Sequence, residues 1–341
     1  MGGTDIQSAS VLNDLPARRH YHLMAGRLYG LDALRGVAAL AVATFHLAET
    51  YHLPAVPIGY SVAVDLFFIL SGFVMTRTYE DRLRDGLTTL GFIGLRYRRL
   101  FLPLAIGSTI GLAVTAAMLG PSIPMTAAYL LILLFLPAGG PHAFALNVPA
   151  WSVFVEIVAN ALHGAIFARL SNARLLVLTG LCGVLAAGAA EGHMYWGADI
   201  VSILWLIPRE LTCYLVGIWM FRRYGDAPLG HHPIAAVVAL VILLGIALTN
   251  AVFEIAALAA CPFIVRASLS LPRTQWAAWA GALSYPLYAT HFPVILVSFW
   301  TGLHPAAGAA LVATVAIAVT LAFEIRRRPL AISQELPGQA A

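Results

Sequence analysis

The chain has 341 residues, of which 60% are hydrophobic and only 11% are charged, and its mean hydropathy is +0.83. A soluble domain typically has about 25% charged residues, so this composition excludes a soluble globular protein and predicts an integral membrane protein. The net charge is +4, every one of the 20 basic residues is an arginine, and the apolar stretches leave no room for a separate soluble domain.

The apolar segments predict an all-α, polytopic membrane bundle. The polar residues 1–27 are expected to form a cytoplasmic tail, residues 28–328 one membrane domain, and residues 329–341 a short C-terminal tail. A hydrocarbon core of about 30 Å needs roughly 20 helical residues. The expected spans are 29–48, 58–76, 101–119, 148–168, 174–190, 199–221, 233–249, 250–266, 276–300 and 304–325.

The arginines predict how these spans are oriented. A further apolar segment, 124–137, is short and is bracketed by prolines. If it does not cross the membrane, every arginine except the intramembrane Arg35 and Arg209 falls on the side of the N-terminus; if it crosses, those arginines divide evenly. The positive-inside rule therefore favours ten spans in the cell membrane, both termini in the cytoplasm, and 124–137 lying on or re-entering the outer face.

Several ionisable side chains lie within the predicted spans, where such residues are costly and commonly functional. Arg35 is expected about 10 Å above the inner end of the first span, and His46 about 16 Å further out. Their eleven-residue separation is close to three turns, so both face the same side. Asp65, Glu156 and His291 are expected at a depth similar to that of His46.

A cluster of arginines is expected below this outer polar level. Arg96, Arg98 and Arg99 fall in the predicted inner loop 77–100, just before Pro103 opens the third span. Arginine recognises phosphate through bidentate, charge-assisted hydrogen bonds. Together with Arg35, these arginines predict a site for the phosphates of a cytoplasmic donor.

The outer polar level predicts acid–base chemistry. His46 is expected to act as a general base near neutral pH, oriented by Asp65 or Glu156. A coenzyme A thioester, with its phosphates in the cytoplasm and its reactive group on a long thin arm, fits this arrangement as the donor. The acceptor, a hydroxyl, would arrive from the outer side.

Four sequence blocks resemble the membrane acyltransferase-3 family, whose members move acyl groups, often acetyl, onto sugars and other hydroxylated compounds. They occur in the family's order between residues 31 and 294. The blocks are "LDALRGVAALAVATFHL", "AVDLFFILSGFVMT", "PAWSVFVEIVANAL" and "SYPLYATHFPV".

The resemblance implies roles for individual residues. In the family, the first-span histidine and the arginine below it are needed for transfer, which implies these roles for His46 and Arg35. It also implies acetyl-CoA or another acyl-CoA as donor, with no metal expected. The chain departs from the family where Ile157 replaces a frequent second acidic residue, and it is expected to lack the hydrolase-like domain of some members. Residues expected to contact or support the substrate are Ser71, Trp151, Ser152, Tyr288 and His291.

Several of these residues also have structural explanations. Asp65 could hold the bundle together by pairing with another span, and His291 could help shape the helix at Pro293. Trp151 could anchor the chain at the membrane interface. A serine–glycine pair such as the one at Ser71 marks close helix packing more often than a nucleophile.

Two further features are expected to be mainly structural. Arg209 and Glu210 are adjacent in the sixth span and point in different directions, so we expect a buried pairing of this site with another span, or contact with substrate. The three cysteines show no metal-ligand spacing and are expected to be buried thiols.

The predicted function is O-acyl transfer, most often of acetyl, to a hydroxyl of a carbohydrate such as a surface polysaccharide or a lipid-linked sugar. The expected partners are acyl-CoA, this acceptor and the lipid bilayer, with no nucleic acid. The alternative is a proton-coupled transporter, since intramembrane His, Asp, Glu and Arg also suit proton relays. Transporters often contain related halves, and the Arg35–His46 span has no second copy here. A catalytically silent scaffold is disfavoured because the polar groups gather at one level.

Overall fold

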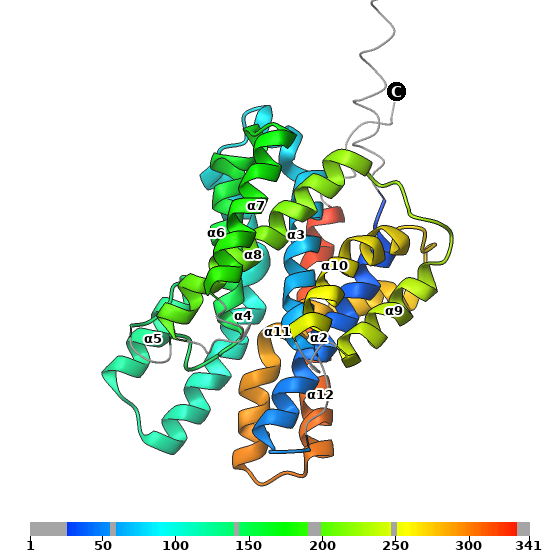
Figure 1. Ribbon diagram of the computed structural model, residues 1–341. Helices are drawn as coiled ribbons and strands as arrows, with labels where there is room; N and C mark the ends of the chain where they lie inside the picture. Colours follow the sequence, from blue (N-terminus) through cyan, green and yellow to red (C-terminus); the bar gives the residue numbers. More distant parts are fainter. Residues whose placement is uncertain (1–25, 55–58, 140–142, 190–198, 247–250, 333–341) are drawn as a thin grey trace, which may run out of the picture.

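The structure is a computed structural model that describes residues 26–54, 59–139, 143–189, 199–246 and 251–332 (Figure 1). All regular elements of these residues are helical, as predicted, and most of the two predicted tails lies outside them. The helices are α2 (Tyr29–Thr50), α3 (Tyr60–Arg84), α4 (Thr89–Leu119), α5 (Ile123–Leu133), α6 (Ala150–Ala165), η1 (Phe167–Arg169), α7 (Asn172–Ala189), α8 (Ile200–Tyr224), α9 (Pro233–Ile246), α10 (Ala251–Ser268), α11 (Gln275–Trp300) and α12 (Pro305–Ile332).

Seven helical segments of the described chain are long and apolar enough to cross a membrane. They are α2, α3, α4, α6 continued through η1, α8, α11 and α12. The helices α5 and α9 are apolar but shorter, and α7 and α10 have 18 residues each. The protein is therefore a multi-pass membrane bundle, while the count of ten spans and the orientation of the termini stay predictions.

The segment α5 was expected to stay on the outer face, and its length agrees with that expectation. It has 11 residues, which as a helix extend only about 16 Å, well short of a hydrocarbon core of about 30 Å. Its N-terminus is fixed by Ser122, whose hydroxyl accepts a hydrogen bond from the backbone N–H of Met125.

The prediction of a loop across residues 77–100 is wrong. The helix α3 continues to Arg84, and α4 begins at Thr89, whose predecessor Thr88 caps the helix by accepting from the Gly91 N–H at 3.1 Å. Pro103 lies inside α4 rather than at its start. A proline is tolerated inside a membrane helix when neighbouring groups satisfy the freed backbone, so it is a weak helix boundary in such a chain.

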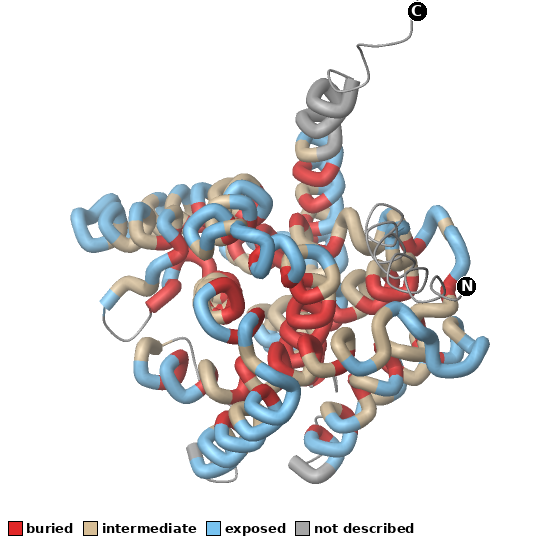
Figure 2. Tube along the Cα trace, turned by 90° about the horizontal axis from the view of Figure 1, so that it is seen from above, coloured by how far each residue is buried: buried red, intermediate tan, exposed pale blue. Residues whose placement is uncertain are grey.

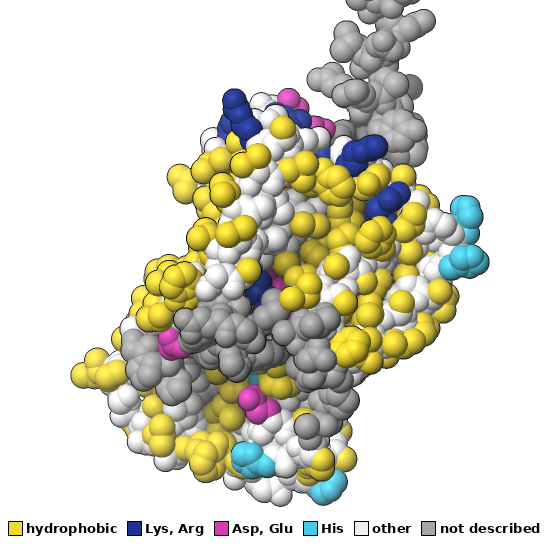
Figure 3. Space-filling view, in the orientation of Figure 1, with side chains coloured by type: hydrophobic (Ala, Val, Ile, Leu, Met, Phe, Trp, Pro, Cys, Tyr) yellow, Lys and Arg dark blue, Asp and Glu magenta, His cyan; other side chains and the backbone are white. Residues whose placement is uncertain are grey.

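The segments predicted to share the inner side do meet at one end of the molecule. Arg77 of α3 forms an ion pair with Asp226 at 2.9 Å and donates to the Gly26 carbonyl. Arg222 of α8 binds Glu80 of α3 at 3.0 Å and also donates to the carbonyls of Phe167 and Leu170. Figure 3 shows most of the basic side chains visible on that face at this end, above a broad hydrophobic surface.

Close backbone approach holds the central helices together. In Figure 1, α3 lies at the centre, with α4, α6, α7 and α8 on one side and α2, α9 and α10 on the other. A Cβ added to Gly72 of α3 would lie 2.0 Å from the Tyr214 carbonyl oxygen of α8, and one added to Gly217 of α8 would lie 2.1 Å from that of Ile69. Small residues allow this packing in membrane helices, and Figure 2 shows the buried residues concentrated at this centre.

One backbone hydrogen bond of helix α11 is missing, and the side chain of a loop residue supplies the donor instead. Pro293 has no N–H, so the carbonyl of Ala289 loses its partner within the helix. The side-chain amide of Asn147, in the loop before α6, donates to that carbonyl at 2.9 Å and is fully buried. Gly107 of α4 makes room for this contact, because a Cβ there would meet the Ala289 carbonyl oxygen at 2.1 Å.

This arrangement predicts that Asn147→Ala destabilises the protein. The change leaves the buried Ala289 carbonyl without a donor, at a cost of about 1–3 kcal/mol. In a Pro293→Ala background, residue 293 regains its N–H and can satisfy that carbonyl, so the same Asn147→Ala change should cost less. Thermal unfolding of the four proteins of this double-mutant cycle in detergent measures both effects, and equal costs in the two backgrounds would contradict this role of Asn147.

Candidate active site

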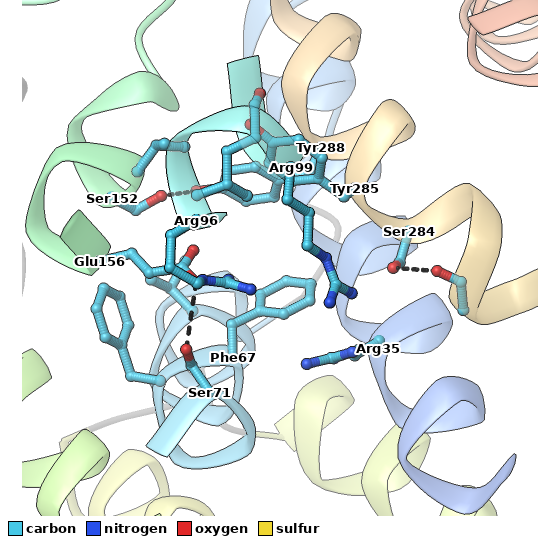
Figure 4. Close-up of a pocket in the computed structure, with 15 residues that line it drawn as sticks. Arg35, Phe67, Ser71, Arg96, Arg99, Ser152, Glu156, Ser284, Tyr285 and Tyr288 are labelled. Atoms are coloured by element: carbon cyan, nitrogen blue, oxygen red, sulfur yellow. Dashed lines mark hydrogen bonds and ion pairs between the residues drawn. The ribbon is translucent and has the colours of Figure 1, made fainter. Parts of the chain in front are cut away.

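A cavity of about 780 Å³ lies between α2, α3, α4, α6 and α11 (Figure 4). Its walls combine basic, hydroxyl and aromatic side chains from helices that are far apart in the sequence. The residues that line it are Arg35, Val64, Phe67, Phe68, Ser71, Arg96, Arg99, Leu100, Ser152, Val153, Glu156, Gly281, Ser284, Tyr285 and Tyr288.

Three arginines make the cavity strongly basic. Figure 4 shows the guanidinium groups of Arg35 and Arg99 directed toward one space, with Arg96 beside Glu156 on another side of it. Arg96 is only 4% exposed, and its Nη2 donates to Glu156 Oε1 at 2.6 Å. Its Nε and Nη1 atoms are buried and have no partner within the described chain. Three guanidinium groups face one carboxylate, so the cavity suits an anionic ligand.

The third predicted arginine of this run does not line the cavity. Arg98 and Arg99 are both exposed, but only Arg99 of the two, together with the buried Arg96, lines the cavity. Residues two apart in a helix point to nearly opposite sides, and residues three apart share a face. Because these residues were expected to form a loop, the sequence analysis did not distinguish Arg98 from Arg96 and Arg99.

The serine and tyrosine residues predicted to support the substrate form part of the cavity wall. Ser71 Oγ donates to Glu156 Oε1 at 3.2 Å. Ser152 Oγ and the Tyr288 hydroxyl lie 2.6 Å apart and share a hydrogen bond. Trp151 is half-buried against the core and is not among the cavity residues.

The two predicted histidines meet beyond the tyrosine end of the cavity. His46 Nδ1 of α2 lies 3.2 Å from His291 Nε2 of α11, and the rings are 5.1 Å apart. The Tyr288 ring, which lines the cavity, lies 5.9 Å from the His291 ring. His291 is fully buried, while His46 is only half-buried. Neither histidine is among the residues that line the cavity, and Tyr288 is a cavity residue that lies close to the pair.

The predicted orienting carboxylates are not bonded to His46. Asp65 is fully buried and accepts from Arg209 at 2.7 and 2.9 Å, and Arg209 also binds Glu254 at 2.8 Å. Glu156 is engaged by Arg96 and Ser71. An arginine within reach attracts a carboxylate more strongly than a neutral imidazole does, so the expectation that Asp65 or Glu156 orients His46 is corrected.

The ion group of Asp65, Arg209 and Glu254 links α3, α8 and α10. It confirms the expectation that Arg209 pairs with another span. The neighbouring Glu210 and Cys213 place one potential metal-ligand atom each within 4.8 Å of an oxygen of Asp65. Both Asp65 oxygens already accept from Arg209, and that positive charge opposes a cation there.

Two residues that sequence analysis did not single out also shape the site. Asn147 supports the turn of α11 next to His291, and the Tyr285 hydroxyl donates to the Leu100 carbonyl of α4 at 2.6 Å. Tyr285 was present in the "SYPLYATHFPV" block, so a signal existed for it. Asn147 lies in a loop with no recognisable pattern, and only the missing N–H of Pro293 hinted that a donor was needed.

A profile of the acyltransferase-3 family, described as an acyltransferase domain, matches residues 28–325. "Protein 2 in picA locus" from Rhizobium radiobacter is 37% identical over 187 residues, covering 47% of this chain and 94% of that relative. No solved structure matches the chain. The chain therefore belongs to the acyltransferase-3 family, and the resemblance of the four sequence blocks is confirmed. This membership makes it an acyltransferase and leaves the transporter alternative without support.

The buried ion group predicts a large difference between two arginine substitutions. Arg209→Met leaves Asp65 and Glu254 buried without their cation, and breaking such a group typically costs about 3–5 kcal/mol. Arg27→Met removes a largely exposed pair with Asp32, which is worth about 0–1 kcal/mol. Thermal unfolding in detergent should show a much lower midpoint for Arg209→Met than for Arg27→Met. Similar midpoints for the two variants would mean that the ion group contributes little.

Proposed function

We propose that the protein transfers an acyl group, most often acetyl, from a cytoplasmic acyl-CoA to a hydroxyl of a carbohydrate at the outer side of the cell membrane. One observation carries this proposal: a cavity with three inward guanidinium groups lies next to a histidine pair deep within the membrane bundle. Family membership supports the acyl transfer itself. The donor and the acceptor are inferred from the chemistry of the site.

The arginines suit the phosphates of coenzyme A. Arg96 Nε and Nη1 are buried and have no hydrogen-bond partner among the residues that the structure describes, and Arg35 and Arg99 flank the same space. On α2, the eleven residues from Arg35 to His46 correspond to a rise of about 16 Å. The pantetheine arm of coenzyme A is a narrow, flexible chain of comparable reach. Phosphates bound at Arg35 would therefore place the thioester near His46.

Each residue then has a distinct part in the proposed reaction. His46 accepts the proton of the acceptor hydroxyl as its oxygen attacks the thioester carbonyl. The C–O bond forms, the C–S bond breaks, and the proton on His46 passes to the leaving thiolate. Glu156, which also accepts from Ser71, holds Arg96 in place, and Tyr288 with Ser152 lines the cavity on the side of the histidines. A covalent acyl-histidine is the alternative course, and trapping labelled enzyme without acceptor distinguishes the two.

The central experiment compares envelope glycans by mass spectrometry. A gene deletion is restored with wild type, with His46→Ala, or with His304→Ala at matched membrane abundance. His304 is exposed between α11 and α12, away from the cavity, and serves as the matched histidine control. Wild type and His304→Ala should restore acetyl-sized mass shifts, and His46→Ala should not. Restoration by His46→Ala would remove His46 from the mechanism, and no difference between wild type and deletion would count against acetylation of these glycans.

The donor site is tested separately by coenzyme A binding to the purified protein. Arg35→Gln removes a charge-assisted contact worth about 1.5–3 kcal/mol, so the Kd for coenzyme A should rise roughly tenfold to a hundredfold. Arg98→Gln removes the same charge from the exposed side of α4 and should leave Kd nearly unchanged. Equal effects of the two substitutions, measured by titration calorimetry, would contradict phosphate binding in the cavity.

A further inference from the structure

The hydrogen bonds of His291 determine which of its ring nitrogens carries the proton. Its Nδ1 lies 2.8 Å from the Tyr288 carbonyl oxygen and 3.1 Å from that of Leu287. Carbonyl oxygens only accept hydrogen bonds, so Nδ1 must carry the hydrogen. In a neutral imidazole the other nitrogen then holds a lone pair. His291 Nε2 is therefore an acceptor, and it points at His46.

The same argument applied to His46 assigns its tautomer. Its Nδ1 lies 3.0 Å from the Val42 carbonyl oxygen and 3.2 Å from His291 Nε2. Both neighbours are acceptors, so His46 Nδ1 carries the hydrogen and shares it between them. The lone pair of His46 is thus left on Nε2. Within the described chain, that atom has no hydrogen-bond partner, and His46 is only half-buried.

We propose that His291 is a positioning residue that holds His46 in the Nδ1–H tautomer and thereby leaves Nε2 as the atom that takes the acceptor's proton. This inference rests on the proposed acyl transfer. In serine hydrolases, a carboxylate on the far nitrogen of the histidine performs the same task. Here a neutral imidazole occupies that place, because Asp65 and Glu156 are bonded to arginines.

The proton balance of this arrangement is simple. The hydroxyl proton moves to His46 Nε2, and the imidazolium keeps its Nδ1–H bond to His291 Nε2. That bond becomes charge-assisted and therefore stronger as the charge develops. No proton moves to His291, since its Nδ1–H stays on the backbone carbonyls of α11. His46 then returns the proton from Nε2 to the leaving thiolate.

Two substitutions of His291 distinguish a hydrogen-bond acceptor for His46 from a side chain that only fills the space. His291→Gln can place its carbonyl oxygen close to the position of Nε2 and accept from His46 Nδ1–H, whereas His291→Leu fills the site without an acceptor. With acetyl-CoA and the acceptor identified from the glycan spectra, His291→Leu should lower kcat by about a hundredfold or more. Its KM for acetyl-CoA should remain near the wild-type value, and His291→Gln should recover at least tenfold of the lost kcat. A His291→Leu enzyme with wild-type kcat, or a His291→Gln enzyme as impaired as His291→Leu, would overturn the proposal.

A spectroscopic measurement tests the tautomer without relying on turnover. Solid-state NMR of the full-length protein in lipid, with ¹⁵N-labelled histidine and His46→Ala for assignment, reports which His46 nitrogen is protonated. We expect a protonated Nδ1 that correlates with an unprotonated nitrogen of His291, and loss of that correlation in His291→Leu. A protonated Nε2 in wild type would overturn the inference even if the enzyme transfers acetyl. Conversely, an inactive wild type with the expected tautomer would count against the proposed function while leaving the His46–His291 assignment intact.

Discussion

Ionisable side chains inside this bundle must find their partners within the protein, because lipid hydrocarbon offers neither hydrogen bonds nor charge screening. Two of the ion groups within the described residues illustrate this demand, and both include a side chain from α3. Asp65 joins Arg209 and Glu254, while Ser71 reaches the pair of Arg96 and Glu156. Because each group includes a residue of α3, this helix is linked to α8 and α10 through one group and to α4 and α6 through the other. Of these helices, α3, α4 and α6 form part of the cavity wall.

The two ion groups differ in their balance of charge. Around Arg209 the carboxylates are in excess, and around Glu156 the guanidinium groups are in excess. An unbalanced group is costly in a membrane unless a ligand or a bound proton completes it. The positive excess lies at the cavity, where an anion has room to enter. The arginines of the cavity wall thus suit the binding of an anion.

The sequence predicted the positions of many site residues along their helices. It predicted less well the direction in which each side chain points about the helix axis. The spacing of Arg35 and His46 correctly indicated that both face the interior, because eleven residues nearly complete three turns. Hydropathy also gave the helical class of the fold. It could not give the partner of Asp65, because that depends on how α3 and α8 are rotated about their axes. The close approach at Gly72 fixes that rotation; the Ser71–Gly72 pair indicated close helix packing but not which helix packs there.

The two prolines of α11 bound a short section of this helix that carries two residues of the site. Pro286 and Pro293 each remove one rung of the hydrogen-bond ladder, and the two turns between them carry Tyr288 and His291. The Ala289 carbonyl within this section is bound by Asn147 rather than by a backbone N–H of the helix. Tyr288 lines the cavity and His291 bonds to His46, so a single short stretch of backbone determines the positions of both groups.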